Sequence, residues 1–429
     1  MPTIQSIKTH DFRRKLMDGA GSDAVHTDPS YGYGVTLLKA DNGLEGTGIA
    51  YTLGAGTNLI CEAIRILGES LEGREIEELM ADFGAVQRSL AEHPGLRWLG
   101  PHKGVTHLAL ASITNACFDL WAKSREVPIW KLLLNLSPEE LTRLIDFSYL
   151  EEVLTISEAN ELLHSYKATR SEREEVLKTG YPGYDTSVGW FQYSDEKICN
   201  NARAAVDAGF TAMKLKVGAK DHKHDVRRSL MVREAVGDDV RIMLDANQAW
   251  PLPQAIDACL ALKDMNPFWI EEPTQPDDVS AHQKLAEVIA PIPVAVGEAV
   301  SNRVLWKNFL QAGAVGIVQA DCTRLAGISE WLAVVILARK YPVRLVPHVG
   351  DMGQVHVHLS FFHEMTTMLE YIPWIAHCFE EPIRVENGFY AMPKIPGAST
   401  TLLTSALEDF GVAFVRHHAI LTLFYAVSY

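Results

Sequence analysis

The sequence predicts an α/β protein in which an N-terminal α+β domain precedes a TIM-type (β/α) barrel. Three observations predict this fold. Beyond residue 184, short β-branched stretches alternate with helical stretches, a pattern typical of βαβ units. Upstream, short alternating runs interrupted by glycine give way to helical spacing, which is typical of strands followed by helices. At 429 residues, the chain is also too long for one ordinary domain, so two are expected.

The first domain is expected to contain strands and then helices. Residues 3–52 alternate apolar and polar positions in short runs, which predicts antiparallel strands. Residues 57–124 carry apolar side chains three and four apart, and 105–122 read as one strongly amphipathic or buried helix. The segment 157–180 is charged and helix-prone, so we interpret it as a solvated helical insertion that separates this domain from the barrel.

In the barrel region, six predicted strands end in charged or ionisable side chains. The strands are expected at 211–217, 241–245, 268–272, 294–298, 317–321 and 344–347. Their end residues are the pair Lys214 and Lys216, then Asp245, Glu271, Glu298, Asp321 and His348. From Lys216 to His348 the successive intervals are 23 to 29 residues, and one βα unit takes roughly 20–30 residues. Because the C-terminal strand ends of a barrel converge on one face, these groups are expected to share one site.

These strand-end residues suit proton transfer assisted by a metal ion. Asp245, Glu271 and Glu298 are carboxylates on neighbouring strands with no histidine or cysteine among them, which favours a hard cation, with Mg²⁺ as the default. Lys214 and Lys216 lie two apart on a strand and therefore point to the same side. We expect the second ammonium group and the nearby dication to lower a lysine pKa toward the range of a general base.

Asp321 and His348 fall on adjacent predicted strands, so the carboxylate is expected to orient and charge the imidazole. Base candidates would then flank the metal from opposite sides. Each residue alone also has an ordinary structural interpretation, such as a helix N-cap or a turn, but their joint occurrence at one βα spacing favours a site. His356 and His358 could suggest a further metal cluster, yet their helical sequence favours a packed or solvated helix face.

The motifs around these residues resemble the mandelate racemase subgroup of the enolase superfamily over nearly the whole chain. They are Lys214-Leu215-Lys216, Asp245-Ala246-Asn247, Ile270-Glu271-Glu272-Pro273, Gly297-Glu298 and the pair Asp321 and His348. The segments 21–29, 96–101 and 119–123 look more particularly like the L-fuconate dehydratase family.

The resemblance implies a modified (β/α)7β barrel with an N-terminal α+β capping domain. The capping domain would cover residues 1–140 and be completed by the C-terminal segment 396–429. The barrel would cover 141–395 and carry the helical insertion near 157–180. The apolar run at 419–427 is too short to span a membrane, and we expect it to pack against the capping domain or another subunit.

By the same resemblance, the protein is expected to be a hydro-lyase that converts an acid sugar, such as L-fuconate or L-galactonate, to the 2-keto-3-deoxy acid. Asp245, Glu271 and Glu298 would hold Mg²⁺, and Lys216 would remove the α-proton. His348, supported by Asp321, would protonate the departing 3-hydroxyl. Removal of the α-proton creates an enediolate that a divalent cation stabilises, and this superfamily is known for pairing a lysine or histidine base with Mg²⁺.

Both domains are expected to bind the substrate. The resemblance assigns to this role Lys214, Asn247 and His348 of the barrel and Gly21, Ser22, Asp23 and Tyr31 of the capping domain. The position of the family's late substrate-binding glutamate aligns with His377, with Glu380 and Glu381 nearby, and the sequence leaves open which of the three takes that role.

Two other functions remain compatible with the same residues. A racemase or epimerase would abstract and return the α-proton between Lys216 and His348. A catalytically silent binding protein would be expected to have lost a metal carboxylate or a base, and the sequence retains all of them.

The composition limits the possible partners. The 39 basic and 54 acidic residues give a net charge of −15, which argues against nucleic acid or an anionic membrane as the main partner. The six cysteines form no Cys-x-x-Cys pair, no apolar run reaches the ~18 residues of a membrane span, and the N-terminus lacks a signal pattern. We therefore expect a cytoplasmic enzyme for a small acid-sugar substrate, and family precedent favours a homo-oligomer.

Overall fold

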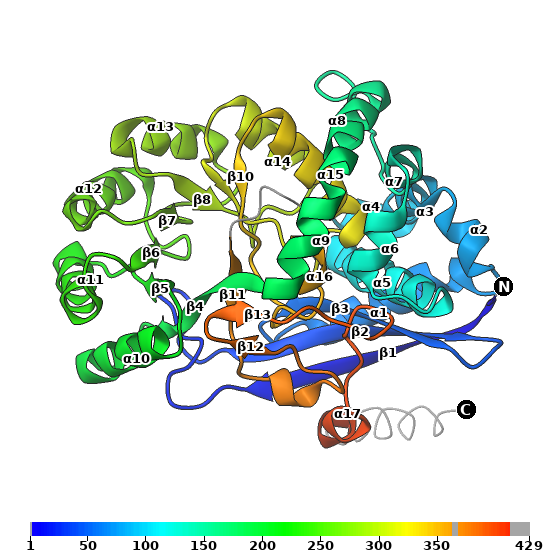
Figure 1. Ribbon diagram of the computed structural model, residues 1–429, viewed down its shortest axis with the longest axis horizontal. Helices are drawn as coiled ribbons and strands as arrows, with labels where there is room; N and C mark the ends of the chain where they lie inside the picture. Colours follow the sequence, from blue (N-terminus) through cyan, green and yellow to red (C-terminus); the bar gives the residue numbers. More distant parts are fainter. Residues whose placement is uncertain (1, 363–367, 412–429) are drawn as a thin grey trace, which may run out of the picture.

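Eight parallel strands form the barrel, and a helix separates each strand from the next (Figure 1). The computed structural model describes residues 2–362 and 368–411. The barrel strands are β4 (Tyr181–Gly189), β5 (Ala212–Lys216), β6 (Arg241–Asp245), β7 (Ile270–Glu271), β8 (Val294–Val296), β9 (Ile317–Val318), β10 (Arg344–Leu345) and β11 (Leu369–Tyr371). Consecutive strands from β4 to β10 pair in parallel, and β11 pairs with β4. This confirms the predicted (β/α)7β barrel.

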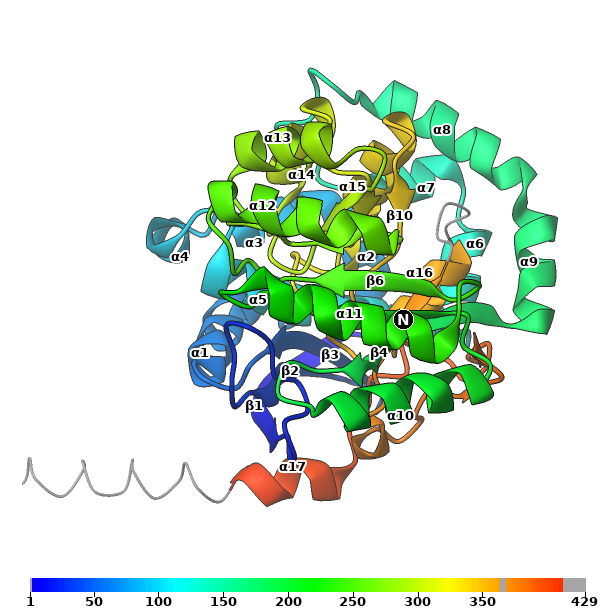
Figure 2. The same ribbon diagram turned by 90° about the vertical axis from the view of Figure 1, so that its left-hand side faces the viewer.

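The helices between these strands lie on the outside of the barrel, and in Figure 2 α10, α11 and α12 lie on the side of the barrel that faces the viewer. They are α10 (Asp195–Asp207), α11 (His222–Val236), α12 (Leu252–Leu262), α13 (Val279–Ile289), α14 (Arg303–Gln311), α15 (Ile328–Lys340) and α16 (His356–Phe362). Because both faces of the strands are covered, β5 and β6 are buried along their whole length except for Arg241 at the start of β6.

A layer of apolar side chains lies inside the barrel, and every strand or its immediate flank contributes one residue to it. The layer consists of Tyr184, Ala212, Met243, Trp269, Ala295, Ile317, Val346 and Met368, all at most 2% exposed. The large rings of Tyr184 and Trp269 meet edge to face with centroids 5.6 Å apart, and alanines on other strands leave room for them. The barrel is therefore a packed core below its C-terminal mouth rather than a pore.

The register of the strands brings their charged ends to one level. Lys216 of β5 lies opposite Asp245 of β6, and Asp245 lies opposite Glu271 of β7. Glu298 follows β8 by two residues, and Asp321 and His348 each follow their strands by three residues. The even βα spacing in the sequence thus becomes a ring of polar side chains at the barrel mouth.

The predicted N-terminal strands form one antiparallel sheet in the order β1 (Ile4–Lys15), β2 (Ser30–Ala40) and β3 (Glu45–Thr52). Its helices are α1 (Thr57–Gly68), α2 (Ile76–Met80), α3 (Phe83–Ala91), α4 (Pro94–Leu99) and α5 (Gly104–Ser124). The long buried helix α5 lies directly on β3. A Cβ at Gly48 would collide with the backbone of α5 at Ser112 and Ala116, so this close approach requires glycine.

Four helices connect the first domain to β4: α6 (Ile129–Asn135), α7 (Pro138–Arg143), α8 (Ile156–Ala168) and α9 (Arg170–Thr179). The last two are the predicted helical insertion. After the barrel, the hairpin β12 (Val385–Glu386) and β13 (Phe389–Tyr390) pairs with β4, and α17 (Thr404–Gly411) lies beside β1. The apolar run 419–427, and the packing expected for it, lie outside the described residues. In the described part of the chain, no helix is both long and apolar enough to cross a membrane.

A buried charge cluster joins the barrel helices to the connecting segment. The guanidinium of Arg303, at the start of α14, contacts Asp146 at 2.5 Å and Glu330 of α15 at 2.9 Å, and all three side chains are at most 2% exposed. Removing one member of such a cluster leaves an uncompensated buried charge.

Arg303→Met is therefore expected to lower the free energy of unfolding by about 3–5 kcal/mol, because Glu330 loses its cation inside the protein. Urea unfolding followed by circular dichroism measures the change. Arg65→Met is the control, since Arg65 pairs with Glu62 and Glu69 on an exposed helix face, where ion pairs contribute little. Equal unfolding midpoints for the two variants would contradict the expectation.

Candidate active site

A cavity of about 460 Å³ lies at the C-terminal ends of the barrel strands and is lined by both domains. The barrel contributes, among others, Trp190, Lys214, Lys216, Asn247, Gln248, Glu298, Arg324, His348 and Glu370. The N-terminal domain contributes, among others, Gly21, Asp23, His26, Tyr31 and Tyr51. The cavity therefore brings together predicted residues that lie more than 300 positions apart in the chain.

The two lysines of β5 lie between the cavity and the carboxylates of the next strands. The Nζ atom of Lys216 lies 2.5 Å from Oδ2 of Asp245, and that of Lys214 lies 2.7 Å from Oε1 of Glu271. Lys216 also lies over the ring of Trp190, with Nζ 4.9 Å from its centroid. Both ammonium groups thus reach the cavity while remaining paired with the predicted metal ligands.

Carboxylates are crowded at these strand ends. Burial raises the pKa of Glu271 to about 7, and the charge of Asp245 adds to this effect. Burial also raises the pKa of Glu272 well above its ordinary value, with Glu298 adding to it. One oxygen of Glu272 has no hydrogen-bond partner among the described residues. A divalent cation would relieve this crowding, and an all-oxygen donor set fits a hard ion such as Mg²⁺.

The expected lowering of the lysine pKa values includes the effect of a dication, and the chain by itself does not produce it. Burial lowers the pKa of Lys216, but Asp245, Glu298 and Asp23 together raise it above its ordinary value. Burial likewise opposes the charge of Lys214, and Glu271 and Glu370 outweigh it, so this pKa also lies above its ordinary value. The physical reason is the strand register, which gives each ammonium group a carboxylate partner as well as a like-charged neighbour.

Asp321 and His348 are brought together as the sequence predicts. Nδ1 of His348 donates to Oδ2 of Asp321 at 2.7 Å, and its Nε2 lies 2.9 Å from Oε2 of Glu298. Burial lowers the pKa of His348, but Glu298 and Asp321 raise it by more, so it lies well above its ordinary value. The N-terminal domain buttresses this turn, because a Cβ at Gly350 would lie 2.5 Å from the ring of Tyr51.

The predicted residues of the N-terminal loop divide into two groups. Gly21, Asp23 and Tyr31 line the cavity, as does Asn247 of the barrel. Ser22 does not line it: its buried hydroxyl donates to the carbonyl of Gly19 and accepts from the backbone N–H of Gln192. The structure therefore gives Ser22 the role of fixing this loop onto the segment that follows β4.

The late acidic residue that reaches the cavity is Glu370, whereas His377, Glu380 and Glu381 do not line it. Glu370 lies on β11, lines the cavity and contacts Nζ of Lys214 at 2.8 Å. His377 is exposed in a short 3₁₀ helix beyond the strand, and Glu380 and Glu381 do not line this cavity. The last strand arrives only 22 residues after His348, and the acidic residue on that strand is the sequence signal that marks the position.

Sequence reasoning also missed Trp190, Tyr51 and Arg324. Trp190 directly follows the first barrel strand, but a rule that selects ionisable strand-end residues does not find a tryptophan. Arg324 donates to the backbone carbonyls of Glu298 and Tyr51 and so connects barrel and N-terminal sheet beside the cavity. For Tyr51 and Arg324 no sequence signal existed, because their position depends on how the two domains pack.

Comparison with known proteins identifies the family. Residues 197–406 match the family model described as Enolase C-terminal domain-like. The chain is 38% identical over 420 residues to Mitochondrial enolase superfamily member 1 of Homo sapiens, across 94% of this chain and 95% of that protein. It is 36% identical over 422 residues to L-galactonate dehydratase of Hypocrea jecorina, across 95% and 94% of the two chains.

Two solved structures show the same architecture. The crystal structure of the human protein has a TM-score of 0.92 to this chain at 36% identity and covers 95% of both chains. L-talarate/galactarate dehydratase from Salmonella typhimurium LT2, liganded with Mg and L-lyxarohydroxamate, has a TM-score of 0.76 at 25% identity and covers 95% of this chain and 92% of its own. The chain therefore belongs to the enolase superfamily.

Proposed function

We propose that this protein is a Mg²⁺-dependent dehydratase that converts an acid sugar to its 2-keto-3-deoxy acid. The observation that carries the proposal is the arrangement of Lys216 and His348, which line one cavity on either side of the strand-end carboxylates. The strands β6, β7 and β8, which bear those carboxylates, lie between β5 with its lysine and β9 and β10 with the Asp321–His348 pair.

Asp245, Glu271 and Glu298 are proposed to hold the cation, since they are oxygen donors at consecutive strand ends. When bound, Mg²⁺ supplies Lewis-acid stabilisation of the charge that develops on the substrate carboxylate. A cation that draws on the charge of Asp245 would also weaken the hold of that carboxylate on Lys216, which favours the neutral lysine.

The side chains of this protein then perform the proton transfers. Lys216 takes the proton from the carbon next to the substrate carboxylate, and the C–H electrons pass into the developing enediolate. His348, oriented by Asp321, delivers a proton to the 3-hydroxyl, whose C–O bond breaks so that water leaves. The resulting enol takes up a proton at C3 and becomes the 2-keto-3-deoxy acid. Lys214, held by Glu271 and Glu370, is positioned to bind the substrate carboxylate.

The relatives support the acid-sugar class. One is an L-galactonate dehydratase that matches almost the whole chain, and another is an L-talarate/galactarate dehydratase. We propose L-fuconate or a close relative such as L-galactonate as the substrate, because an N-terminal loop resembling the L-fuconate dehydratase family encloses the cavity. An isomerase is the second candidate, since the opposed placement of Lys216 and His348 also suits removal and return of one proton.

A screen of acid sugars with Mg²⁺ tests the proposal, and 2-keto-3-deoxy products are the expected readout. His348→Asn is expected to lower the rate of elimination by about 100-fold or more, because the acid that protonates the 3-hydroxyl is lost. The same variant retains Lys216 and the carboxylates, so it should still exchange the α-hydrogen of L-fuconate for deuterium. Proton NMR in ²H₂O follows both reactions in one sample.

The parent enzyme is the reference for this experiment. If it yields only the 2-epimer of its substrate, and no keto-deoxy acid forms from any sugar acid tested, the dehydratase proposal is wrong and the isomerase takes its place.

A further inference from the structure

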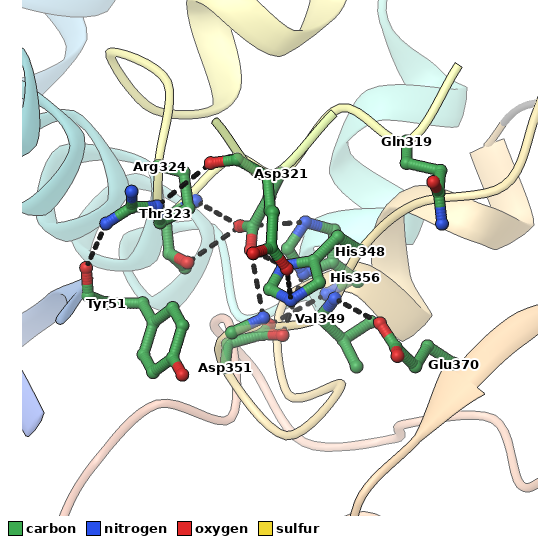
Figure 3. Close-up of polar contacts among 12 residues, drawn as sticks. Tyr51, Gln319, Asp321, Thr323, Arg324, His348, Val349, Asp351, His356 and Glu370 are labelled. Atoms are coloured by element: carbon green, nitrogen blue, oxygen red, sulfur yellow. Dashed lines mark hydrogen bonds and ion pairs between the residues drawn. The ribbon is translucent and has the colours of Figure 1, made fainter. Parts of the chain in front are cut away.

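A second carboxylate–imidazole pair lies directly behind the Asp321–His348 pair. Figure 3 shows Asp321 beside both His348 and His356, with Asp351 next to His356. Asp351 and His356 are fully buried and do not line the cavity. Neither residue can touch a substrate there, so any influence on the chemistry has to pass through Asp321.

Asp351 is anchored by the beginning of α16. Its carboxylate accepts backbone N–H groups from Gly353, Val355 and His356, which satisfy its charge in the manner of a helix cap. Its Oδ1 also lies 2.7 Å from Nδ1 of His356. Because a carboxylate can only accept, this contact puts a proton on Nδ1.

The other ring nitrogen of His356 holds the peptide that follows Asp321. The backbone N–H of Cys322 donates to Nε2 of His356 at 3.1 Å, so Nε2 acts as an acceptor in this contact. Nε2 also lies 3.4 Å from Oδ1 of Asp321. Burial opposes a charge on His356, but Asp351, Cys322 and Asp321 together raise its pKa above the ordinary value; a proton on Nε2 would face the Cys322 N–H. On its other side, the carbonyl of Cys322 accepts from the amide of Asn115 in α5.

The orientation of Asp321 depends on this peptide. One carboxylate oxygen accepts from the backbone and hydroxyl of Thr323, both at 2.7 Å, and the other accepts from His348 and from the backbone of Gly350. Two of these four bonds come from the same short loop, whose backbone His356 fixes. A shift of the loop would therefore rotate the carboxylate away from His348.

The cluster of Asp321, Cys322 and His356 has potential ligand atoms within 4.8 Å of one another, yet the hydrogen bonds argue against a metal. Nε2 of His356 already accepts a hydrogen bond, and burial raises the pKa of the Cys322 thiol to about 12, which keeps it protonated. The pair behind Asp321 is better explained as a support.

We propose that His356, held by Asp351, is a positioning residue that fixes the Asp321–Cys322 peptide through Nε2 and thereby keeps Asp321 aimed at His348. The inference rests on the proposed function only for its effect on turnover. The geometric part, the position of the Asp321 carboxylate, holds whatever the substrate is.

Two substitutions separate the two ring nitrogens. In His356→Gln, the side-chain carbonyl can reach the position of Nε2 and accept the Cys322 N–H, whereas the bond to Asp351 is lost. In His356→Asn, the amide can reach the position of Nδ1 and donate to Asp351, whereas Cys322 loses its acceptor. The glutamine variant is therefore expected to keep elimination within about 3-fold of the parent, and the asparagine variant to lose about 10- to 100-fold in kcat with an unchanged KM.

The ratio of the elimination rate to the rate of α-hydrogen exchange separates a positioning effect from a loss of fold. A partly unfolded enzyme loses both in proportion, but a misdirected Asp321 impairs His348 and leaves exchange by Lys216 intact. His358→Asn is the matched control, because His358 lies on the same helix and is equally buried but contacts Ser399 and Trp130 instead. This control should leave the ratio unchanged.

Crystal structures of the two His356 variants test the geometry without any substrate. The contact between Asp321 and Nδ1 of His348 should persist in His356→Gln and lengthen in His356→Asn. If that contact is the same in both variants, or if both change the elimination-to-exchange ratio equally, the positioning role is overturned. A parent enzyme that dehydrates no acid sugar would instead refute the proposed function, and the structures would still decide on His356.

Discussion

Lys216→Ala is expected to lower the rate of product formation and the rate of exchange of the substrate α-hydrogen with solvent, each by about 1000-fold or more. The reason is that Lys216 is proposed to be the base for that proton, and loss of a general base costs about 100- to 10,000-fold. Its ammonium group reaches the cavity beside Asp245, and Lys214, the next candidate, is held by Glu271 and Glu370. Proton NMR in ²H₂O measures exchange, and a keto-acid assay measures the product.

Lys220→Ala is the matched control for this variant. Lys220 follows the same strand but is exposed and does not line the cavity, so its replacement should leave both rates unchanged. Circular dichroism verifies that both proteins are folded. Exchange that persists in Lys216→Ala would mean that another residue is the base, and the assignment of the two β5 lysines would have to be revised.

Glu271→Gln is expected to weaken Mg²⁺ binding by at least about 100-fold and to remove turnover, while the barrel stays folded. Substituting a residue that only orients a metal ligand typically lowers metal affinity or activity by about 10–100-fold. Substituting a direct ligand should lower metal affinity by more. Oε2 of Glu271 also accepts from Trp269 and Gln319, and its Oε1 faces Lys214. An amide nitrogen in either position would oppose a donor, so the glutamine cannot reproduce all of these contacts.

Isothermal titration with MgCl₂ measures the binding, and Glu287→Gln is the control, since Glu287 lies exposed on α13 in the unit that follows β7. Chelation of the parent enzyme with EDTA should give the same loss of turnover, reversible on adding Mg²⁺. Full activity of Glu271→Gln in metal-free buffer would show that the strand-end carboxylates do not form a metal site.

Prediction from sequence was strongest where a local rule repeats. The interval between strand ends follows from the length of one βα unit, so the spacing alone assigns Asp245, Glu271 and Glu298 to adjacent strands. The rule was not applied beyond His348, and the resemblance pointed to His377 instead of Glu370. Glu370 on β11 lies 22 residues after His348 and completes the ring.

By itself, the sequence determined a (β/α) barrel, its antiparallel N-terminal sheet and the set of ionisable residues at the strand ends, because strand period, helix period and unit length are local properties of the chain. Only the tertiary structure decided which partner each of these residues meets. It paired Lys216 with Asp245, whose charge counteracts the effect of burial on the pKa of this lysine. It also placed His356, 35 residues beyond Asp321, against the loop that orients His348. Such contacts depend on strand register and helix packing. These bring together residues from distant parts of the chain, and the neighbours of each charged group set its electrostatic energy.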